Sequence, residues 1–517
     1  MKILLRPLLV AALALLICAP ALAQRQIVVA QGEGVENWDP PVGWDSASEW
    51  IEMNVYDCLT FPDRETGEMV GWLAESWENL DDTTWRLSLR QGVTFHNGTP
   101  FTAEDVKFSI DRIINGSREQ FIVFNQWAFV DTVTIIDDYT IEITTDYPDP
   151  AFLSEISGTG CGVVSKAYVE EVGDNGLANF GMGTGPFKLV DYDRDQHVIL
   201  EANEDYWGGK PEIDRLVFRV IPEPSTRIAE LLTGGVDIAP GILPQDLPRI
   251  EADPRLQVVQ YLTDRVYGLT IAHAPPPGVD AVATSIPEIR EAIDYAIDRD
   301  ELIALAGGGV PTLTRLTPPL PCWDTVDPPL YNVNPYDPER ARQILEEIGY
   351  PDVPGGPVIT LHGTFGQYIA QREIAETIAT MLEDVGFEVD LDIREFSTFR
   401  ETVYRGSNEE LMLQSLGNII TDPWIYILNY DSRFGNRIPV RGRFSNPELD
   451  TLAAAANVAM DPAERCRILN EYAHKVVNFR PTIELFRMAD SIAMPVNVSW
   501  TPPPDGNLQF VNLTFND

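Results

Sequence analysis

Three glycines at alternate positions could form a phosphate-binding loop in the stretch GMGTGPF, residues 181–187. A phosphate cradle requires a strand, then the glycine turn, then a helix whose N-terminal amides face the anion. Here the polar stretch GDNGLANF precedes the glycines, and the following FKLVDY alternates as a strand does. Pro186 also lacks the amide hydrogen that a phosphate would accept. The stretch therefore predicts a tight turn that leads into a strand, and not an anion site.

Patterns of catalytic and metal-binding residues are missing from the sequence. It contains no H-E-x-x-H, no G-x-S-x-G and no G-x-x-x-x-G-K-[ST]. Acidic residues are so abundant that pairs of carboxylates carry no information. We therefore expect no catalytic residue, no metal site and no cofactor. The five histidines are scattered along the chain without paired spacing: His96, His197, His273, His362 and His474.

The charge of the chain excludes some partners. It carries 79 acidic and 37 basic residues, which gives a formal net charge of −42. Such a negative field repels nucleic acid and anionic membrane surfaces, and it favours solubility. The simplest interpretation is a highly solvated acidic surface around an ordinary core, since 44% of the residues are hydrophobic.

The first residues are typical of a secretory signal peptide. Lys2 and Arg6 form a positive start, residues 8–17 an apolar core, and Ala21-Leu22-Ala23 a cleavage site. The apolar run is shorter than the roughly 20 residues that a spanning helix needs. We predict cleavage after Ala23 and export from the cytoplasm, which leaves 517 − 23 = 494 residues.

Four cysteines remain after cleavage, and an oxidising compartment permits them to form disulfides. No C-x-x-C is present, which argues against a zinc site. The four cysteines, Cys58, Cys161, Cys322 and Cys466, allow three pairings. A Cys58–Cys161 bond would stay within the N-terminal part, but the sequence does not select it.

Short strand patterns alternate with amphipathic helices throughout the chain. Trp85, Leu87 and Leu89 alternate as in a half-buried strand. After the turn HNGTP, Thr102 and Asp105 have the spacing of a capping box at a helix start. Apolar residues then recur at helical spacing, and they do so again in two later segments. These helical sets are Val106, Ile110, Ile113 and Ile114; Ile289, Ala292, Ile293, Ala296 and Ile297; and Ile374, Ile378, Met381, Leu382 and Val385.

Six stretches, in this order, resemble a known family over nearly the whole mature chain. The chain is similar to periplasmic solute-binding proteins of ABC importers, bacterial extracellular solute-binding family 5, the oligopeptide, dipeptide and nickel class. The stretches are NWDP at 37–40, LAESWENL…SIDRI at 73–113, GTGPFKL…VDIAP at 183–240, IREAIDYAIDRDELI at 289–303, YDPERARQILEEIGY at 336–350 and NPELDTLAAAANVAMDPAER at 446–465.

The resemblance implies an α/β fold, the periplasmic-binding-protein type II fold of cluster C. Two lobes would close by a hinge motion over a ligand in the cleft between them, and a membrane permease would read the closed state. The chain would cross between lobes at YGLTIAHA (267–274) and ELFRMAD (484–490), and the protein would be a monomer. The expected boundaries are 1–23 for the signal peptide, 24–271 for lobe I with an inserted subdomain at about 46–184, 272–486 for lobe II, and 487–517 for the return to lobe I.

The candidate ligand contacts follow from the same resemblance. The segment GNIITDPWIYILNYDSR (417–433) is similar to one in which dipeptide-binding members hold the ligand's α-amino group with an acid. Asp422 matches that acid, although Asp-Pro is equally suited to begin a helix. Trp424 and Tyr426 replace the family's usual residues, which weakens the dipeptide assignment. Arg441, in a basic cluster, and Arg372 could hold a ligand carboxylate. The remaining candidates are Trp44 and Trp323, in segments that border the cleft in relatives.

The sequence leaves the class of ligand open. Short peptides or peptide-like compounds are the leading interpretation. The tryptophans Trp44, Trp323 and Trp424 favour an oligosaccharide as the alternative. A metal chelate is less favoured because no histidine falls in the segments expected to line the cleft, and a hydrolase would need a motif that is absent.

Overall fold

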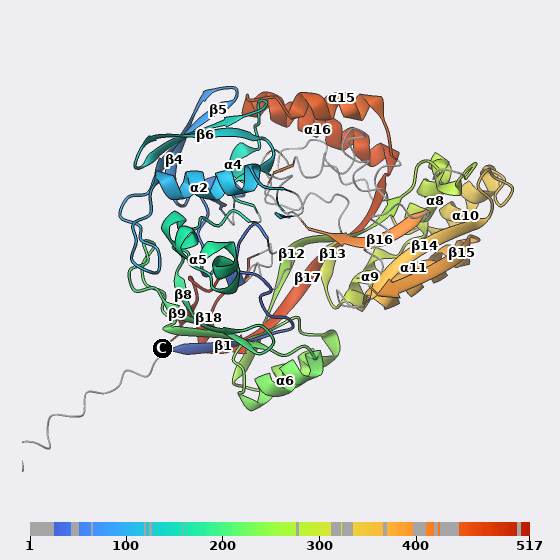
Figure 1. The fold of residues 1–517 in the computed structure, drawn as a ribbon. Coiled ribbons are helices and arrows are strands. Elements are labelled where there is room, and N and C mark those ends of the chain that lie inside the picture. The colour runs from blue at the N-terminus through green and yellow to red at the C-terminus, as the bar shows by residue number, and fades with distance from the viewer. Residues whose placement is uncertain are drawn as a thin grey trace, which may run out of the picture.

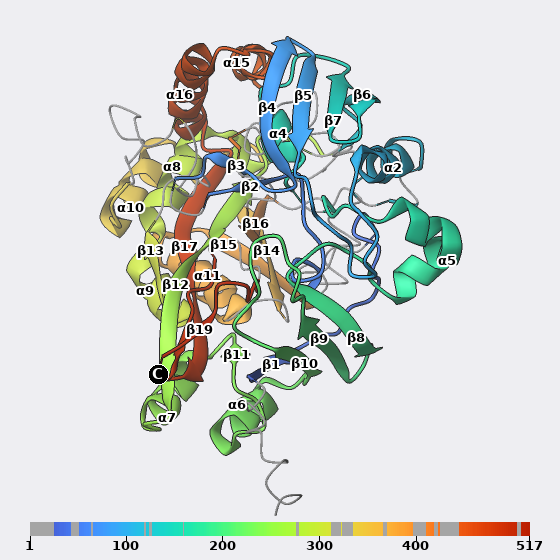
Figure 2. The same ribbon diagram turned by 90° about the vertical axis from the view of Figure 1, so that its left-hand side faces the viewer.

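Three sheets organise the computed structural model. It describes residues 25–42, 51–63, 66–117, 120–121, 123, 127–158, 160–275, 279–311, 322, 334–365, 370–395, 410–417, 422–423, 444–503 and 508–516. Figures 1 and 2 show the sheets with helices packed against them, and helix α6 (Pro224–Thr233) at the bottom of both views. Figure 2 also shows the short helix α7 (Leu247–Glu251) at the lower end of the molecule. Among the described residues, no helix is long and apolar enough to span a membrane.

The first sheet lies near the N-terminus and has the strand order β1-β10-β9-β8. Strand β1 pairs parallel to β10, and the other pairs are antiparallel. The C-terminal segment packs into the same core, since the Phe510 ring lies against that of Phe218 on β10 with 5.9 Å between ring centroids. The strands are β1 (Gln26–Gln31), β8 (Phe187–Asp193), β9 (His197–Ala202) and β10 (Arg215–Val220).

The second sheet is wholly antiparallel and has its own core. Its order is β4-β5-β7-β6, and helix α2 (Ala103–Ile114) packs on β6. The capping box predicted at the start of α2 is confirmed, because the Thr102 amide donates to Asp105 Oδ2 at 2.9 Å. We call this sheet with α2 and the short helix α4 (Phe152–Glu155) the β4–β7 subdomain. Its strands are β4 (Ala74–Asp81), β5 (Thr84–Leu89), β6 (Val130–Asp137) and β7 (Thr140–Thr145).

The third sheet runs through the middle of the molecule. Its order is β11-β17-β12-β16-β14-β15, and β13 adds to β17. The helices α8 and α11, which the apolar spacing predicts, supply much of its core. The strands are β11 (Ala239–Pro240), β12 (Leu256–Ile271), β13 (Gly309–Pro311), β14 (Val358–Phe365), β15 (Glu388–Glu395), β16 (Leu411–Leu416) and β17 (Thr482–Pro495). The helices beside it are α8 (Pro287–Ala296), α9 (Arg299–Ala306), α10 (Pro338–Glu347) and α11 (Gln371–Val385).

The long strands β12 and β17 each belong to two cores. Tyr267 and Leu269 on β12 pack with α8 and α11, whereas Val259 and Tyr261 pack against the core of the first sheet. Between these two groups, the register in which β12 pairs with β17 shifts, in the stretch from Leu262 to Val266. The shift is held by side chains: Thr263 Oγ1 donates to the Met488 carbonyl at 3.1 Å, and Arg487 Nε donates to the Thr263 carbonyl. The lobe boundaries stay a prediction, but the two cores meet on these two strands.

The three glycines of GMGTGPF lead into β8, as the alternation predicts. The reason for the glycines is different from the tight turn that we expected, since none of them has a positive φ. A Cβ on Gly181 would lie 2.8 Å from the Trp38 ring, and a Cβ on Gly183 would lie 2.1 Å from the Val55 carbonyl oxygen. The glycines are required because two stretches of chain approach each other too closely for side chains.

Asp57 gathers four hydrogen-bond donors in the interior. Its Oδ1 accepts from Trp72 Nε1 at 2.7 Å and from the Tyr206 hydroxyl at 3.2 Å. Its Oδ2 accepts from Thr184 Oγ1 at 2.8 Å and from Trp207 Nε1 at 3.0 Å. Burial raises the pKa of Asp57, and the four donors oppose that rise. The carboxylate joins segments that are more than 100 residues apart in the chain.

Two disulfides are present in the structure. Cys58 bonds to Cys161 and Cys322 to Cys466, with Cα–Cα distances of 5.2 Å and 5.0 Å. Of the three pairings that the sequence allows, this is the one that contains Cys58–Cys161. The second bond attaches Cys322 to helix α16 (Pro462–Phe479).

We expect peptide mapping of the unreduced mature protein to recover two cross-linked pairs, Cys58–Cys161 and Cys322–Cys466, and no alkylated cysteine. The protein should be isolated from the periplasm under a thiol-blocking reagent, so that disulfides cannot exchange. A Cys58–Cys322 or Cys161–Cys466 peptide would contradict the pairing.

We expect Asp57→Asn to lower the free energy of unfolding by about 2 to 5 kcal/mol, because the new amide nitrogen leaves two buried donors without an acceptor. Urea denaturation would measure the change. Asp131→Asn, on the exposed part of β6, is the matched control and should remain within about 0.5 kcal/mol of wild type. An Asp57→Asn variant as stable as this control would contradict the role of Asp57.

Candidate ligand site

The structure describes two of the seven predicted ligand contacts. Asp422 and Arg372 are among the described residues, whereas Trp44, Trp323, Trp424, Tyr426 and Arg441 lie outside them. The roles of those five residues stay predictions.

Asp422 forms a buried ion pair with Arg465. Both of its oxygens are engaged: Arg465 Nη1 donates to Oδ2 and Nη2 donates to Oδ1, each at 2.7 Å. Asp422 is 5% exposed and Arg465 is 8% exposed. A two-pronged pair of this kind is strong and fixes the orientation of both groups. A ligand ammonium that used Asp422 would therefore have to share the carboxylate with Arg465.

Arg465 owes its position to helix α16, which packs against α15 (Pro447–Ala456) over a small core of their own. Its Nε donates to the carbonyl of Ala456, at the end of α15, at 3.4 Å. Cys466 follows it directly and carries the second disulfide. Burial alone would lower the pKa of Arg465, but Asp422 and then Asp149 and Glu155 raise it above its ordinary value.

Asp149 and Glu155 reach this pair from the β4–β7 subdomain. Asp149 precedes helix α4, and its Oδ1 accepts a hydrogen bond from the Ala151 amide at 2.9 Å. Asp149 is 5% exposed and Glu155 is 8% exposed. No spacing along the chain distinguishes Arg465, Asp149 and Glu155 from the many other charged residues, so the sequence does not predict them as site residues.

Arg372 lies near the start of α11 and is half exposed. Its guanidinium is placed over the ring of Phe365, 4.7 Å from the centroid, and Nη1 is 3.9 Å from Glu376 Oε1. A cation over an aromatic face retains donors for a further partner. The arrangement is compatible with a carboxylate contact, which stays a prediction.

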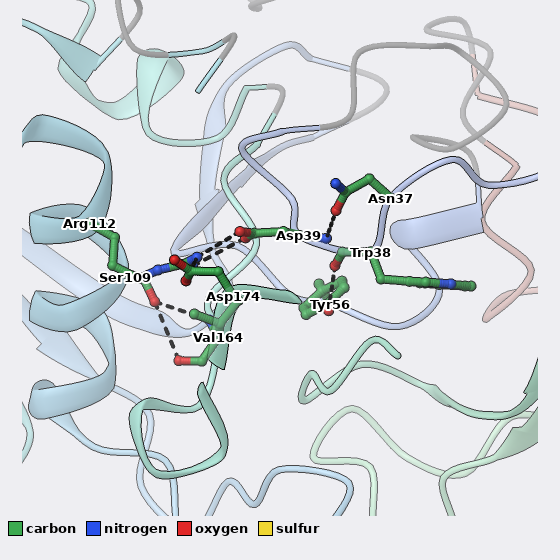
Figure 3. A network of polar contacts seen from close by, with 8 residues as sticks. All are labelled: Asn37, Trp38, Asp39, Tyr56, Ser109, Arg112, Val164 and Asp174. Atoms are coloured by element: carbon green, nitrogen blue, oxygen red, sulfur yellow. Dashed lines mark hydrogen bonds and ion pairs between the residues drawn. The ribbon is translucent and has the colours of Figure 1, made fainter. Parts of the chain in front are cut away.

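The NWDP stretch is a structural junction (Figure 3). Arg112 of α2 donates to both oxygens of Asp39, at 3.1 Å and 2.6 Å, and also to Asp174 at 2.8 Å. Burial raises the pKa of Asp39, while Arg112 opposes the rise. Beside it the Tyr56 hydroxyl donates to the Trp38 carbonyl at 2.8 Å. Trp38 is fully buried in the core of the first sheet, so the NWDP stretch is packed into the interior on that side.

Comparisons with known proteins identify the class. The sequence model of the family "Bacterial extracellular solute-binding proteins, family 5 Middle" matches residues 68–437 of this chain. The chain therefore belongs to this family, and it is a solute-binding protein of the type that serves ABC transporters.

Three relatives indicate the range within the family. Heme-binding protein A of Haemophilus influenzae is 30% identical over 80% of this chain and 77% of its own length. Glutathione-binding protein GsiB of Pectobacterium atrosepticum is 29% identical over 73% of this chain and 71% of its own. The periplasmic binding protein DppA of Helicobacter pylori, solved with the peptide STSA, has a TM-score of 0.76 at 24% identity and covers 95% and 98% of the two chains. The type II periplasmic-binding-protein fold is thereby confirmed.

We expect Asp422→Ala to lower the free energy of unfolding by about 3 to 5 kcal/mol, because it leaves the buried Arg465 guanidinium without its partner. Thermal and urea unfolding would measure this. Asp384→Ala, at an exposed position of α11, is the control and should change stability by less than about 0.5 kcal/mol. A fully stable Asp422→Ala protein would show that the ion pair does not support the fold.

Proposed function

We propose that this protein captures short peptides or peptide-like compounds in the periplasm and delivers them to the permease subunits of an ABC importer. The observation that carries the proposal is the family match over residues 68–437. The peptide-bound DppA structure and the glutathione-binding relative support a peptide-like ligand.

A specific observation favours the alternative, a non-peptide solute on the same scaffold. The heme-binding relative covers 80% of this chain at 30% identity, so the family accommodates ligands of very different chemistry. An oligosaccharide, which Trp44, Trp323 and Trp424 would suit, belongs to the same alternative.

The mechanism that we propose is recognition without reaction. The shared strands β12 and β17 connect the two cores, and the register shift near Leu262 is the place where a hinge would bend. A ligand that contacts both sides stabilises the closed form by its differential affinity for that form. We propose ligand contacts from Asp422, Trp424, Tyr426, Trp44, Trp323, Arg372 and Arg441.

The remaining parts of the proposal concern processing and partners. The signal peptide is cleaved after Ala23, and the mature protein is a monomer that catalyses no reaction. It binds no nucleic acid, because the chain carries a formal net charge of −42.

Thermal-shift assays on the mature protein test the ligand class. A ligand that binds only the folded protein stabilises it by about 2.7 kcal/mol when present at about 100 times its dissociation constant. We expect a panel of di- to pentapeptides to raise the unfolding midpoint. If hemin or oligosaccharides raise it and peptides do not, the peptide assignment is wrong, and a new product after incubation would contradict the absence of catalysis.

Variants sharpen the same assay. With any peptide that gives a shift, Arg372→Ala should weaken the shift. Arg342→Ala, a half-exposed arginine on α10, should leave it unchanged. If the peptide raises the unfolding midpoint equally in both variants, Arg372 does not contact the ligand.

A further inference from the structure

Four charged residues with almost no exposure meet between two parts of the molecule that have separate cores. Asp149 and Glu155 come from the β4–β7 subdomain, whose core contains Phe152 and Ile156. Asp422 and Arg465 belong to the α15–α16 side, whose core contains Leu449 and Tyr472. Figures 1 and 2 both show α15 and α16 beside the β4–β5 edge of the subdomain. The contact between these parts therefore contains buried charge.

The charges of the four residues do not balance. Arg465 supplies one positive charge, and Asp422 already takes both of its Nη groups. The carboxyls of Asp149 and Glu155 lie close enough to the same guanidinium for their charges to raise the pKa of Arg465. Three acids and one guanidinium are thus buried close together among the residues that the structure describes. Burial disfavours the ionised form of a carboxyl group, so it favours a proton on one of these acids.

The position of that proton is indicated by Asp149. Its Oδ1 accepts from the Ala151 amide, whereas its buried Oδ2 has no hydrogen-bond donor among the residues that the structure describes. The neighbouring Glu155 side chain is within hydrogen-bonding reach of Asp149. Two carboxylates cannot bond to each other unless one of them carries a proton. A proton between Asp149 and Glu155 supplies the missing donor and removes one negative charge.

We propose that these four residues form a contact between the two lobes, which we call the latch. Asp149 and Glu155 contribute to it from the subdomain side, and the Asp422–Arg465 pair contributes from the α15–α16 side. The latch holds the lobes together when the carboxyls of Asp149 and Glu155 share one proton. Asp149, Glu155 and Arg465 are positioning residues for closure. The latch makes closure of the lobes depend on pH, and this contact forms without the ligand.

The direction of the pH dependence follows from the pKa of Asp149. In the closed arrangement burial raises it from 3.8 to about 6; Asp422 adds to the rise, while the Ala151 amide, Arg465 and Glu155 oppose it. Opening the lobes separates Asp149 from Asp422 and admits water, so the pKa falls back towards 3.8. The closed form thus binds the proton more tightly. Closure is fully favoured below about pH 4, and this preference is lost as the pH rises through about 6.

Other groups around Asp149 do not alter this sign. Tyr147 is close enough that Glu155, Asp149 and Asp146 raise its pKa, and it remains neutral over this range. Asp146 is exposed to solvent. A difference of about two pKa units between the closed and open forms changes the closing equilibrium by up to about 100-fold.

Small-angle X-ray scattering of the ligand-free mature protein, from about pH 4.5 to about pH 8, tests the latch. We expect a compact particle at the acid end and a larger radius of gyration above about pH 6. Asp149→Asn should stay compact at every pH, because the amide is neutral and its oxygen still accepts from Ala151. Glu155→Gln should move the transition to lower pH, because its NH₂ donates to ionised Asp149.

Asp146→Asn is the matched control, an exposed aspartate in the same loop, and should follow wild type. Circular dichroism at each pH confirms that every variant is folded. A wild-type radius that does not change with pH, or a transition that persists in Asp149→Asn, overturns the proposal. Since no ligand is used, either result is independent of whether the protein binds peptides.

Discussion

The whole architecture depends on one antiparallel pair, the long strands β12 and β17. Their hydrogen-bonded ladder runs from Leu256/Pro495 to Thr270/Thr482, so it passes through two hydrophobic cores. A strand buries its side chains against the layer that covers it, and the layer that covers β12 and β17 changes along their length. The shift in pairing register between Leu262 and Val266 of β12 lies where the covering layer changes. Two lobes joined by a pair of strands can rotate relative to each other while each core stays intact.

Buried carboxylates connect the segments that pack around β12 and β17, and each carboxylate has a different set of hydrogen-bond partners. Asp57 accepts hydrogen bonds from four uncharged donors, and Asp39 is paired with the charged Arg112 at the NWDP junction. Asp422 is paired with Arg465, but Asp149 nearby has only one donor among the described residues. A fully satisfied carboxylate rigidifies its surroundings, whereas an incompletely satisfied one responds to pH or to a ligand. The contact between the subdomain and α15–α16 is of the second kind.

Much of the fold could be predicted from local pattern. The helices α2, α8 and α11 follow from apolar residues at helical spacing, and β5 and β8 from alternation, because these signals depend on near neighbours in the chain. The ligand site could not be predicted to the same degree. Asp422 and Arg465 are separated by 43 positions, and Asp149 lies on another part of the fold. Their meeting is a property of packing, which no spacing in the sequence encodes.

The sequence by itself determined the class of the protein, since its ordered family stretches indicate a solute-binding protein. For the glycines of GMGTGPF it predicted a tight turn that leads into a strand. Only the tertiary structure decided that Gly181 and Gly183 lie too close to Trp38 and Val55 to carry a side chain. It likewise decided which cysteines pair, and which acids lose contact with water. The physical reason is the same in each case: distance and burial are set by segments far apart in the chain, and a charge acquires its chemistry from those neighbours.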